Sequence, residues 1–277
     1  MSEKIPDGRF PFGKMKRKRE HDYYKEVTKS QTVQEQGNEP EDIYTIYDSP
    51  LSSNTGSDAS FDISFSKLLE RKGKSIRSFI EKSLENKRRK AVGIEFGGPG
   101  SNLFAGFSSG FFARSLGVTL ADLRDLDKKS RDEDRHHSVI AGNIADLSTY
   151  KLVKEWLDAE QADLIIERLA GGHVLIPRDP HLLGQIFQAW YELLADSGLI
   201  MAQTNHWMRP VLVPWFELVK HQSKGELGIE YEHGWGNQSD TFDAIFLRKL
   251  DGAPQKLPML DARTIREISK NESSNWV

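Results

Sequence analysis

The chain has 277 residues, with 41 acidic and 38 basic side chains and a formal net charge of −3. This balance gives no general attraction for nucleic acids, and the length is enough for one sizeable core plus appendages. The absence of cysteine excludes disulfides, thiolate nucleophiles and cysteine-ligated zinc. No apolar run approaches the roughly 20 residues that span a bilayer, and the N-terminus lacks the apolar core of a secretory signal. The sequence therefore predicts a cytoplasmic protein.

Composition divides the chain before any motif does. Residues 1–60 are polar and poor in aliphatic side chains, which predicts a disordered tail. Its basic run from Lys14 to Arg19 is typical of a solvated charge cluster, with a nuclear address as the alternative. Between Phe61 and Leu84 apolar residues recur at helical spacing, which predicts a helical lid or brace over residues 61–90.

Residues 91–252 alternate apolar runs with amphipathic segments, which predicts an α/β domain with a mostly parallel sheet covered by helices on both faces. A polar C-terminal tail, residues 253–277, follows, with one short helical stretch at Ala262–Ile268. The expected strands are Ala91–Phe96, Gly117–Ala121, Ser138–Ala141, Ala162–Glu167, Leu199–Gln203, an extended segment Leu227–Glu232 and a last strand within Thr241–Leu250.

Three helices are expected between these strands. Asn102–Leu116 has an aromatic stripe, with Gly106 and Gly110 one turn apart, which would let a helix approach its strand closely. Another helix begins at Asp179 and Pro180, which suit the N-cap and first helical positions, and ends at Gly198. The third lies near Val211–Gln222.

A glycine-rich turn directly after the first strand is the most informative motif. Glu95 and Phe96 end the apolar run, and Gly97, Gly98, Pro99 and Gly100 follow at once. A backbone without Cβ atoms can approach a ligand closely and can adopt dihedral angles that other residues resist. The motif is typical of a nucleotide-type cofactor site, although Gly/Pro clusters after strands are also common as plain turns.

Polar side chains follow the ends of further strands. Asp122 follows the second strand at about the distance of a ribose-binding acid, Asn143 and Ile144 follow the third, and Glu167 ends the fourth. Open α/β sheets bind ligands at the carboxyl ends of their strands. Each of these residues alone is commonly a cap or a surface charge, and it is their order that indicates a cofactor edge.

On these residues, the segment from about Ala91 to Leu250 resembles a class I S-adenosylmethionine-dependent methyltransferase, a family with a Rossmann-like seven-stranded sheet. The resemblance implies that the turn after Glu95 lies against the methionine part of the cofactor and that Asp122 holds its ribose. It places Asn143 and Ile144 beside the adenine, and the fourth strand at the methyl-transfer end. The implied S-adenosyl-L-methionine ligands are Glu95, Gly97, Gly98, Pro99, Gly100, Asp122, Asn143, Ile144 and Glu167, with no metal.

The sequence departs from the family pattern at three positions. Pro99 stands where a glycine is commoner, Asn143 replaces a commoner aspartate, and Thr119 occupies an alternative register for the ribose acid.

The resemblance predicts methyl transfer, with a small-molecule acceptor favoured, a protein acceptor second and nucleic acid disfavoured, because the fourth strand lacks the Pro-Pro-Tyr/Phe segment of amino-directed nucleic-acid enzymes. One alternative is a catalytically inactive methyltransferase fold that serves as a binding or scaffold protein. Another is an NAD(P)-dependent Rossmann oxidoreductase, which is disfavoured because Leu103 stands at the third glycine of its fingerprint.

Catalytic residues are weakly marked. His173, just past the fourth strand, is the candidate for a general base, and a loop histidine is its simpler interpretation. The adjacent pair His136 and His137 follows a charged loop, Lys128 to Arg135, and is expected to be solvent-exposed rather than metal-binding. Side chains that would line an acceptor pocket or simply pack in the fold are His206, Trp207, His233 and Trp235.

Overall fold

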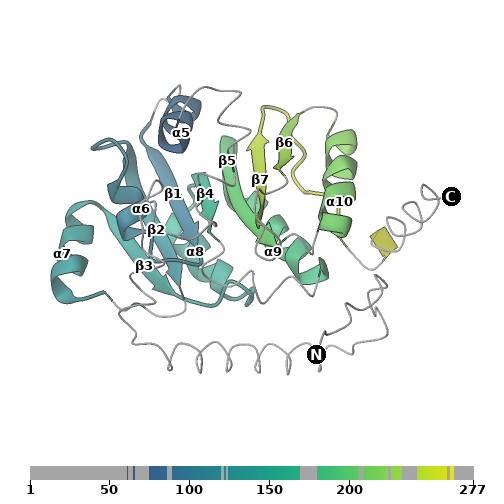
Figure 1. Ribbon diagram of the computed structural model, residues 1–277. Helices are drawn as coiled ribbons and strands as arrows, with labels where there is room; N and C mark the ends of the chain where they lie inside the picture. Colours follow the sequence, from purple (N-terminus) through teal and green to yellow (C-terminus); the bar gives the residue numbers. More distant parts are fainter. Residues whose placement is uncertain are drawn as a thin grey trace, which may run out of the picture. The chain divides into compact units, whose positions relative to one another are not determined.

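Seven strands form one sheet in the order β3-β2-β1-β4-β5-β7-β6 (Figure 1). The first five strands in this order run parallel, whereas β7 is antiparallel to both of its neighbours, β5 and β6. This confirms the predicted fold class, a Rossmann-like, mostly parallel, seven-stranded sheet with helices on both faces. The strands are β1 (Ala91–Phe96), β2 (Phe112–Thr119), β3 (His137–Ala141), β4 (Ala162–Glu167), β5 (Leu194–Asn205), β6 (Leu227–Glu232) and β7 (Phe242–Lys249).

The computed structural model describes a defined part of the chain. The predicted tail, the linker parts of the predicted lid and most of the chain after residue 260 lie outside the described residues. Among the helices described, none has both the length and the apolar character needed to cross a membrane. The described residues are 61, 65, 75–85, 89–119, 122, 124–168, 180–205, 209–223, 226–232, 242–260 and 263–264.

The predicted helix Asn102–Leu116 is wrong. Helix α6 covers only Ser101–Ala105 and ends at Gly106, and the chain enters β2 at Phe112 after Gly110, whose φ is +71°. The aromatic residues that suggested a helical stripe instead cluster across this connection, since the Phe112 ring meets the rings of Phe104 and Phe107 edge-on at 5.0 Å. The spacing of the aromatic residues in the sequence is therefore compatible with a helix, although the backbone here turns back into the sheet.

Two further boundaries differ from expectation. Helix α9 (Pro180–Leu193) passes directly into β5, so Gly198 lies within the strand instead of ending the helix. Leu194 already pairs with Ala162 of β4, which explains why the strand begins there. The charged segment predicted as a loop is helix α7 (Leu126–Asp134), whose N-terminus is capped by the Asp125 carboxylate accepting from the Lys128 amide.

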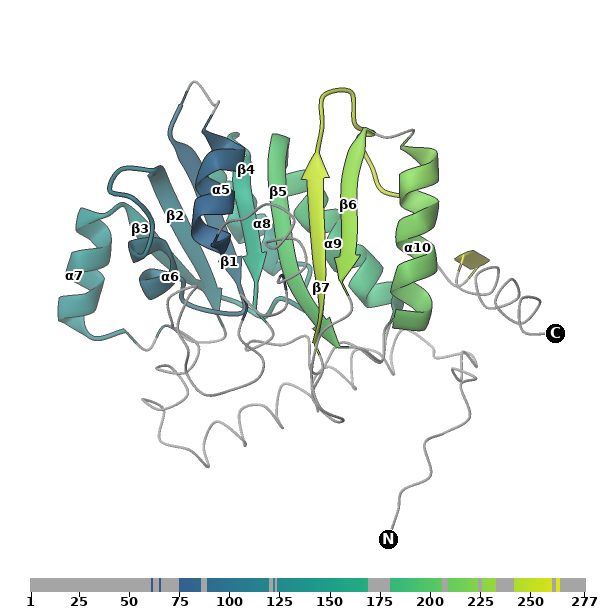
Figure 2. The ribbon, with the colours of Figure 1, turned by 45° about the horizontal axis from the view of Figure 1, so that its top comes forward.

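Alternate residues of each strand serve the two faces of the sheet. Helix α5 (Ile76–Leu84) and α6 cover one face, with Gly93 of β1 against the Phe104 ring. Helices α8 (Thr149–Leu157) and α9 cover the other, where Phe96 of β1 stacks on Trp190 at 5.6 Å. Figure 2 shows α5 in front of the sheet and α8 and α9 behind it.

The chain after β7 packs on the same layer as α9 and helix α10 (Arg209–Gln222). Tyr191 of α9 donates its hydroxyl to the Pro254 carbonyl, and the Trp215 indole of α10 donates to the Pro258 carbonyl at 2.9 Å. Leu257 and Leu260 are buried there. Residues 253–260, which composition placed in a polar tail, therefore contribute to the core.

Gly117 of β2 provides a test of how tightly the turn after β1 is held against the sheet. An ideal Cβ at Gly117 would lie 1.9 Å from the Pro99 carbonyl oxygen, so we expect Gly117→Ala to force the turn away and to lower the free energy of unfolding by about 3 kcal/mol in urea titrations. The matched control is Gly228→Ala in β6, whose Cβ would meet Arg248 at an ordinary 3.5 Å, and which should change stability by less than about 1 kcal/mol. Equal stability of the two variants would contradict this packing.

Candidate functional site

The turn after β1 is built on glycine geometry. Gly97 and Gly100 have φ values of +89° and +73°, a region that favours glycine. The Gly97 amide donates to the Val118 carbonyl of β2 at 2.8 Å, which fixes the turn to the neighbouring strand. The predicted glycine turn therefore lies at the carboxyl end of the parallel strands, where open α/β sheets bind their ligands.

Glu95 lies directly beneath this turn. Its side chain is buried and accepts a hydrogen bond from the Arg168 guanidinium at the end of β4. An ideal Cβ at Gly98 would lie 3.0 Å from the Glu95 carboxyl carbon. The turn therefore passes so close over the carboxylate that position 98 has no room for a side chain without a shift of its neighbours.

His137 supports the turn from behind, and the prediction that it is solvent-exposed is wrong. After helix α7 and its C-cap Arg135, His136 lies in the left-handed region at φ +55°, and His137 begins β3 with its side chain buried. Its Nε2 lies 2.8 Å from the Pro99 carbonyl oxygen, and its Nδ1 lies 2.8 Å from Ser115 Oγ. The signal that could have revealed this position was the apolar run Val139-Ile140-Ala141 shortly after it, which marks His137 as the start of a strand.

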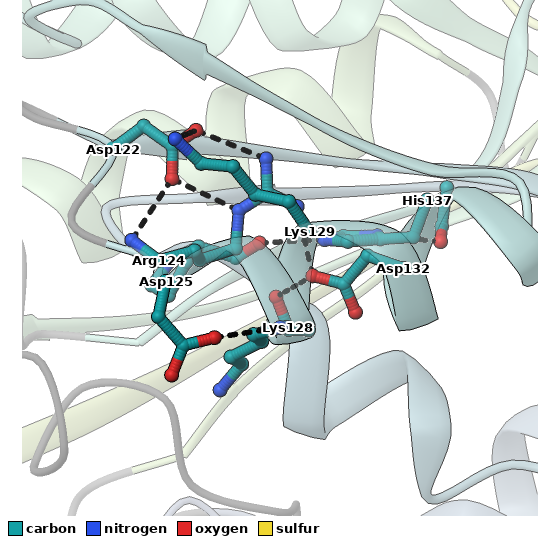
Figure 3. Close-up of polar contacts among 10 residues, drawn as sticks. Asp122, Arg124, Asp125, Lys128, Lys129, Asp132 and His137 are labelled. Carbon is teal, nitrogen blue, oxygen red and sulfur yellow. Dashed lines mark hydrogen bonds and ion pairs between the residues drawn. The ribbon is translucent and has the colours of Figure 1, made fainter.

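A second polar network joins the start of α6 to α7 (Figure 3). The buried Asp132 carboxylate accepts from Ser101 Oγ at 2.7 Å and from Arg124 Nη1 at 2.8 Å. Arg124 in turn holds Asp122 through Nε and Nη2, at 2.9 and 3.1 Å. The three charged side chains thus form one chain of ion pairs, and Ser101, the residue following the glycine turn, joins this chain through its hydrogen bond to Asp132.

Asp122 is less open to a ribose than the sequence suggested. Strand β2 ends at Thr119, so Asp122 lies three residues beyond the strand, in an ion pair with Arg124 and near Lys129. Burial raises the pKa of the Asp122 carboxyl, but the hydrogen bonds and charge of Arg124, helped by Lys129, outweigh burial and hold the pKa below its ordinary value. The carboxylate is therefore charged at neutral pH and already bonded within the chain.

Asn143 and Ile144 form the turn between β3 and α8. The Asn143 side-chain oxygen accepts from the Ala145 amide at 2.9 Å, and the Asn143 carbonyl accepts from Thr149 Oγ1 at 2.8 Å. Ile144 is buried, and its carbonyl accepts from the Tyr150 hydroxyl at 3.0 Å. The structure thus gives both residues a role in shaping the turn.

Glu167 ends β4 as predicted, and its side chain is fully buried. It lies near Tyr150, on the face covered by α8 and α9. Burial raises the pKa of the Tyr150 hydroxyl well above its ordinary value, the charge of Glu167 adds to this, and a hydrogen bond with Trp190 acts in the opposite direction. Glu167 thus places a buried carboxyl group in the interior beside the carboxyl edge of the sheet.

Within the described parts of the chain, no group of three or more His, Asp or Glu side chains is arranged to hold a metal ion. The predicted base and the four predicted acceptor-pocket residues lie outside the described residues; they are His173, His206, Trp207, His233 and Trp235.

Parallel strand order brings most of the predicted residues to one edge. β3, β2, β1 and β4 are neighbours and run the same way, so the segments that follow them share the carboxyl edge of the sheet. Glu95 and the glycine turn lie in the middle, the Asp122 and Asn143 segments lie on one side, and Glu167 with Arg168 lies on the other. The edge therefore presents a glycine-rich turn between segments that carry polar and charged side chains.

A scan against protein-family models finds no match to this chain, and a search of curated proteins finds none either. Solved structures do align with it. An rRNA methylase from Streptococcus thermophilus aligns with a TM-score of 0.43 and 11% identity, over 63% of this chain and 94% of that one. The N-methyltransferase NodS from Bradyrhizobium japonicum gives 0.40 and 17%, over 68% and 99%. An S-adenosylmethionine-dependent methyltransferase from Clostridium acetobutylicum gives 0.42 and 13%, over 67% and 98%. The order and directions of the seven strands define the fold.

The ion pair of Asp122 predicts a pH effect. We expect Arg124→Gln to raise the pKa of Asp122, measured by carboxyl 13C NMR titration, because the hydrogen bonds and charge that lower it are lost. A carboxyl whose folded pKa is depressed stabilises the fold above its unfolded pKa, and that stability is lost as the pH falls through the folded pKa. The variant should therefore lose less stability than the wild type between about pH 5 and pH 3.

Arg131→Gln is the matched control, because it removes one positive charge from the exposed surface of α7, the helix that follows Arg124. It should leave the Asp122 titration close to that of the wild type. If both variants shift the Asp122 pKa equally, the effect is general charge and the ion pair with Arg124 does not set it.

Proposed function

We propose that this protein is an S-adenosylmethionine-dependent methyltransferase. The observation that carries the proposal is the glycine turn that passes directly over the Glu95 carboxylate, at the carboxyl end of the central strand β1. A turn in which three of four residues lack a Cβ, beside a buried acid, suits a ligand that approaches the backbone closely and brings a positive charge. The methionine part of the cofactor has both properties.

The residues at the carboxyl edge of the sheet suit the methionine end of this cofactor better than its adenosyl end. Gly97, Gly98 and Gly100 leave backbone free of side chains, as the methionine end requires, and Glu95 with Arg168 offers one negative and one positive group to its ammonium and carboxylate. The segments that contain Asp122 and Asn143 would bind the adenosyl end of the cofactor. There the ribose hydroxyls would share the Asp122 carboxylate with Arg124, which is a specific feature of this chain.

When bound, the cofactor supplies a sulfonium methyl group that a nucleophile can attack in line with the departing thioether. The part played by the described residues is to bind and orient. Much of the catalysis can come from alignment alone, worth up to about 7–11 kcal/mol in well-oriented cases. A dedicated base among the described residues is therefore not required for the proposal.

The structure favours this function over a nicotinamide-dependent oxidoreductase. The third glycine of a dinucleotide fingerprint lets a long helix pack closely on its strand. Here that position is Leu103, which is fully buried in the core, and α6 is only five residues long. The turn is thus arranged for a different ligand than a dinucleotide pyrophosphate.

We further propose a small-molecule acceptor, because the net charge of −3 gives no general attraction for a nucleic acid phosphate backbone. The test is incubation of the protein with methyl-tritiated cofactor and a cell extract divided into a low-mass filtrate, an RNA fraction and a protein fraction. Label should accumulate in the filtrate. Label in RNA or in protein would overturn this choice of acceptor.

Cofactor binding tests the main proposal. We expect isothermal titration calorimetry to detect binding of S-adenosylhomocysteine and none of NAD. Gly98→Ala should weaken that binding at least about tenfold, since its Cβ would press on the Glu95 carboxyl group that Arg168 holds in place. Gly228→Ala, which adds the same methyl group far along the sheet in β6, should bind like the wild type.

The alternatives predict other results. Tight binding of NAD without S-adenosylhomocysteine would indicate an oxidoreductase. Binding of S-adenosylhomocysteine with no label transferred to any fraction of the extract would favour the inactive scaffold.

A further inference from the structure

We propose that His137 is a positioning residue that sets the conformation of the glycine turn for cofactor binding. The proposal rests on the proposed function and concerns a residue that the sequence assigned to solvent. His137 belongs to β3 and lies beside the turn that contains Gly97 and Gly98. It acts through Pro99, the residue between these two glycines and Gly100.

The hydrogen bond fixes the roles of the two ring nitrogens. The Pro99 carbonyl oxygen can only accept, so the Nε2 atom 2.8 Å away must carry the hydrogen. In the neutral ring Nδ1 then accepts, and Ser115 Oγ at 2.8 Å is placed to donate to it. Ser115 of β2 therefore orients the imidazole so that its donor faces the turn.

The ring is also fitted to the turn by shape. An ideal Cβ at Gly100 would lie 3.1 Å from His137 Cε1, so the imidazole occupies the space beside this glycine. On the other side the ring centroid lies 5.7 Å from that of Phe104 in α6. His137 thus contacts the turn at its carbonyl, at its last glycine and in the helix that follows.

Pro99 explains why such a support is needed. Proline has no amide hydrogen, so at this position the carbonyl is the backbone group that can anchor the turn through a hydrogen bond. The same residue lies against Gly117 of β2, where there is no room for even a methyl group. Pro99 is therefore held by β2 on one side and by the His137 donor on the other. Fixing Pro99 in this way also fixes the position of the preceding glycines, Gly97 and Gly98.

The requirement is for a donor at the Nε2 position and not only for a ring. His137→Phe keeps an aromatic ring without the donor, whereas His137→Gln places an amide nitrogen near the position of Nε2. Tyr191→Phe is the control, because it removes a different buried hydrogen bond, from the tyrosine hydroxyl to the Pro254 carbonyl, in the layer formed by α9.

The first measurement needs no cofactor. The Gly97 amide, bonded to the Val118 carbonyl, reports on the turn, and the Gly142 amide, bonded to Thr119 at the same edge, is an internal reference. In His137→Phe we expect hydrogen exchange at Gly97 to rise about tenfold, the size of one lost buried hydrogen bond, with little change at Gly142. His137→Gln should restore most of the protection, and Tyr191→Phe should leave it unchanged.

The second measurement is binding of S-adenosylhomocysteine by calorimetry. His137→Phe should weaken it about tenfold, His137→Gln should recover most of the affinity, and Tyr191→Phe should bind like the wild type even where its melting temperature falls. Should His137→Phe not fold, His137→Asn replaces it, since its shorter amide cannot reach Pro99.

Equal Gly97 exchange in wild type and His137→Phe would overturn the inference, as would an affinity loss in Tyr191→Phe as large as that in His137→Phe. The two measurements distinguish a failure of the methyltransferase proposal from a failure of the His137 proposal. If the wild type does not bind S-adenosylhomocysteine, the methyltransferase proposal fails, and the exchange at Gly97 alone decides whether His137 positions the turn.

Discussion

The close passage of the Pro99 backbone across Gly117 is the constraint on which the site depends. It brings the turn after β1 onto β2, where the Gly97 amide finds the Val118 carbonyl, and it leaves the turn lying over Glu95. The His137 donor and the Ser101 hydroxyl then hold the turn and the start of α6 from behind. A single backbone contact thus determines where three polar interactions can form.

The sequence predicts the bounds of a strand correctly where a short apolar run is compatible with a strand and with no other element. β1, β4 and β6 have the predicted bounds, because each is a short run ended by a turn or a charged residue. The connection from α6 to β2 was not predictable in the same way. Phenylalanines at helical spacing satisfy a helix and an aromatic cluster across a turn equally well, and the pairing of Ala91 with Phe112 decides between them.

The candidate site divides along similar lines. The glycine turn and Glu95 were found from the sequence because local backbone geometry dictates both. Asp122 was singled out by its spacing, yet its carboxylate is engaged by Arg124, a neighbour that spacing alone did not identify as its partner. His137 was missed because its partners lie 22 and 38 positions earlier in the chain, and its burial depends on tertiary contacts.

The position of β7 between β5 and β6 has a consequence for the order of assembly. Of the strands described, β6 pairs only with β7. Because β7 follows β6 in the sequence, β6 cannot join the sheet until the ribosome has also synthesised β7. Until β7 emerges, β5 presents an open hydrogen-bonding edge of the kind that recruits strands from other chains. Nascent molecules should therefore depend on chaperones most between the synthesis of β5 and that of β7, and premature termination in this interval should yield aggregates rather than a smaller working domain.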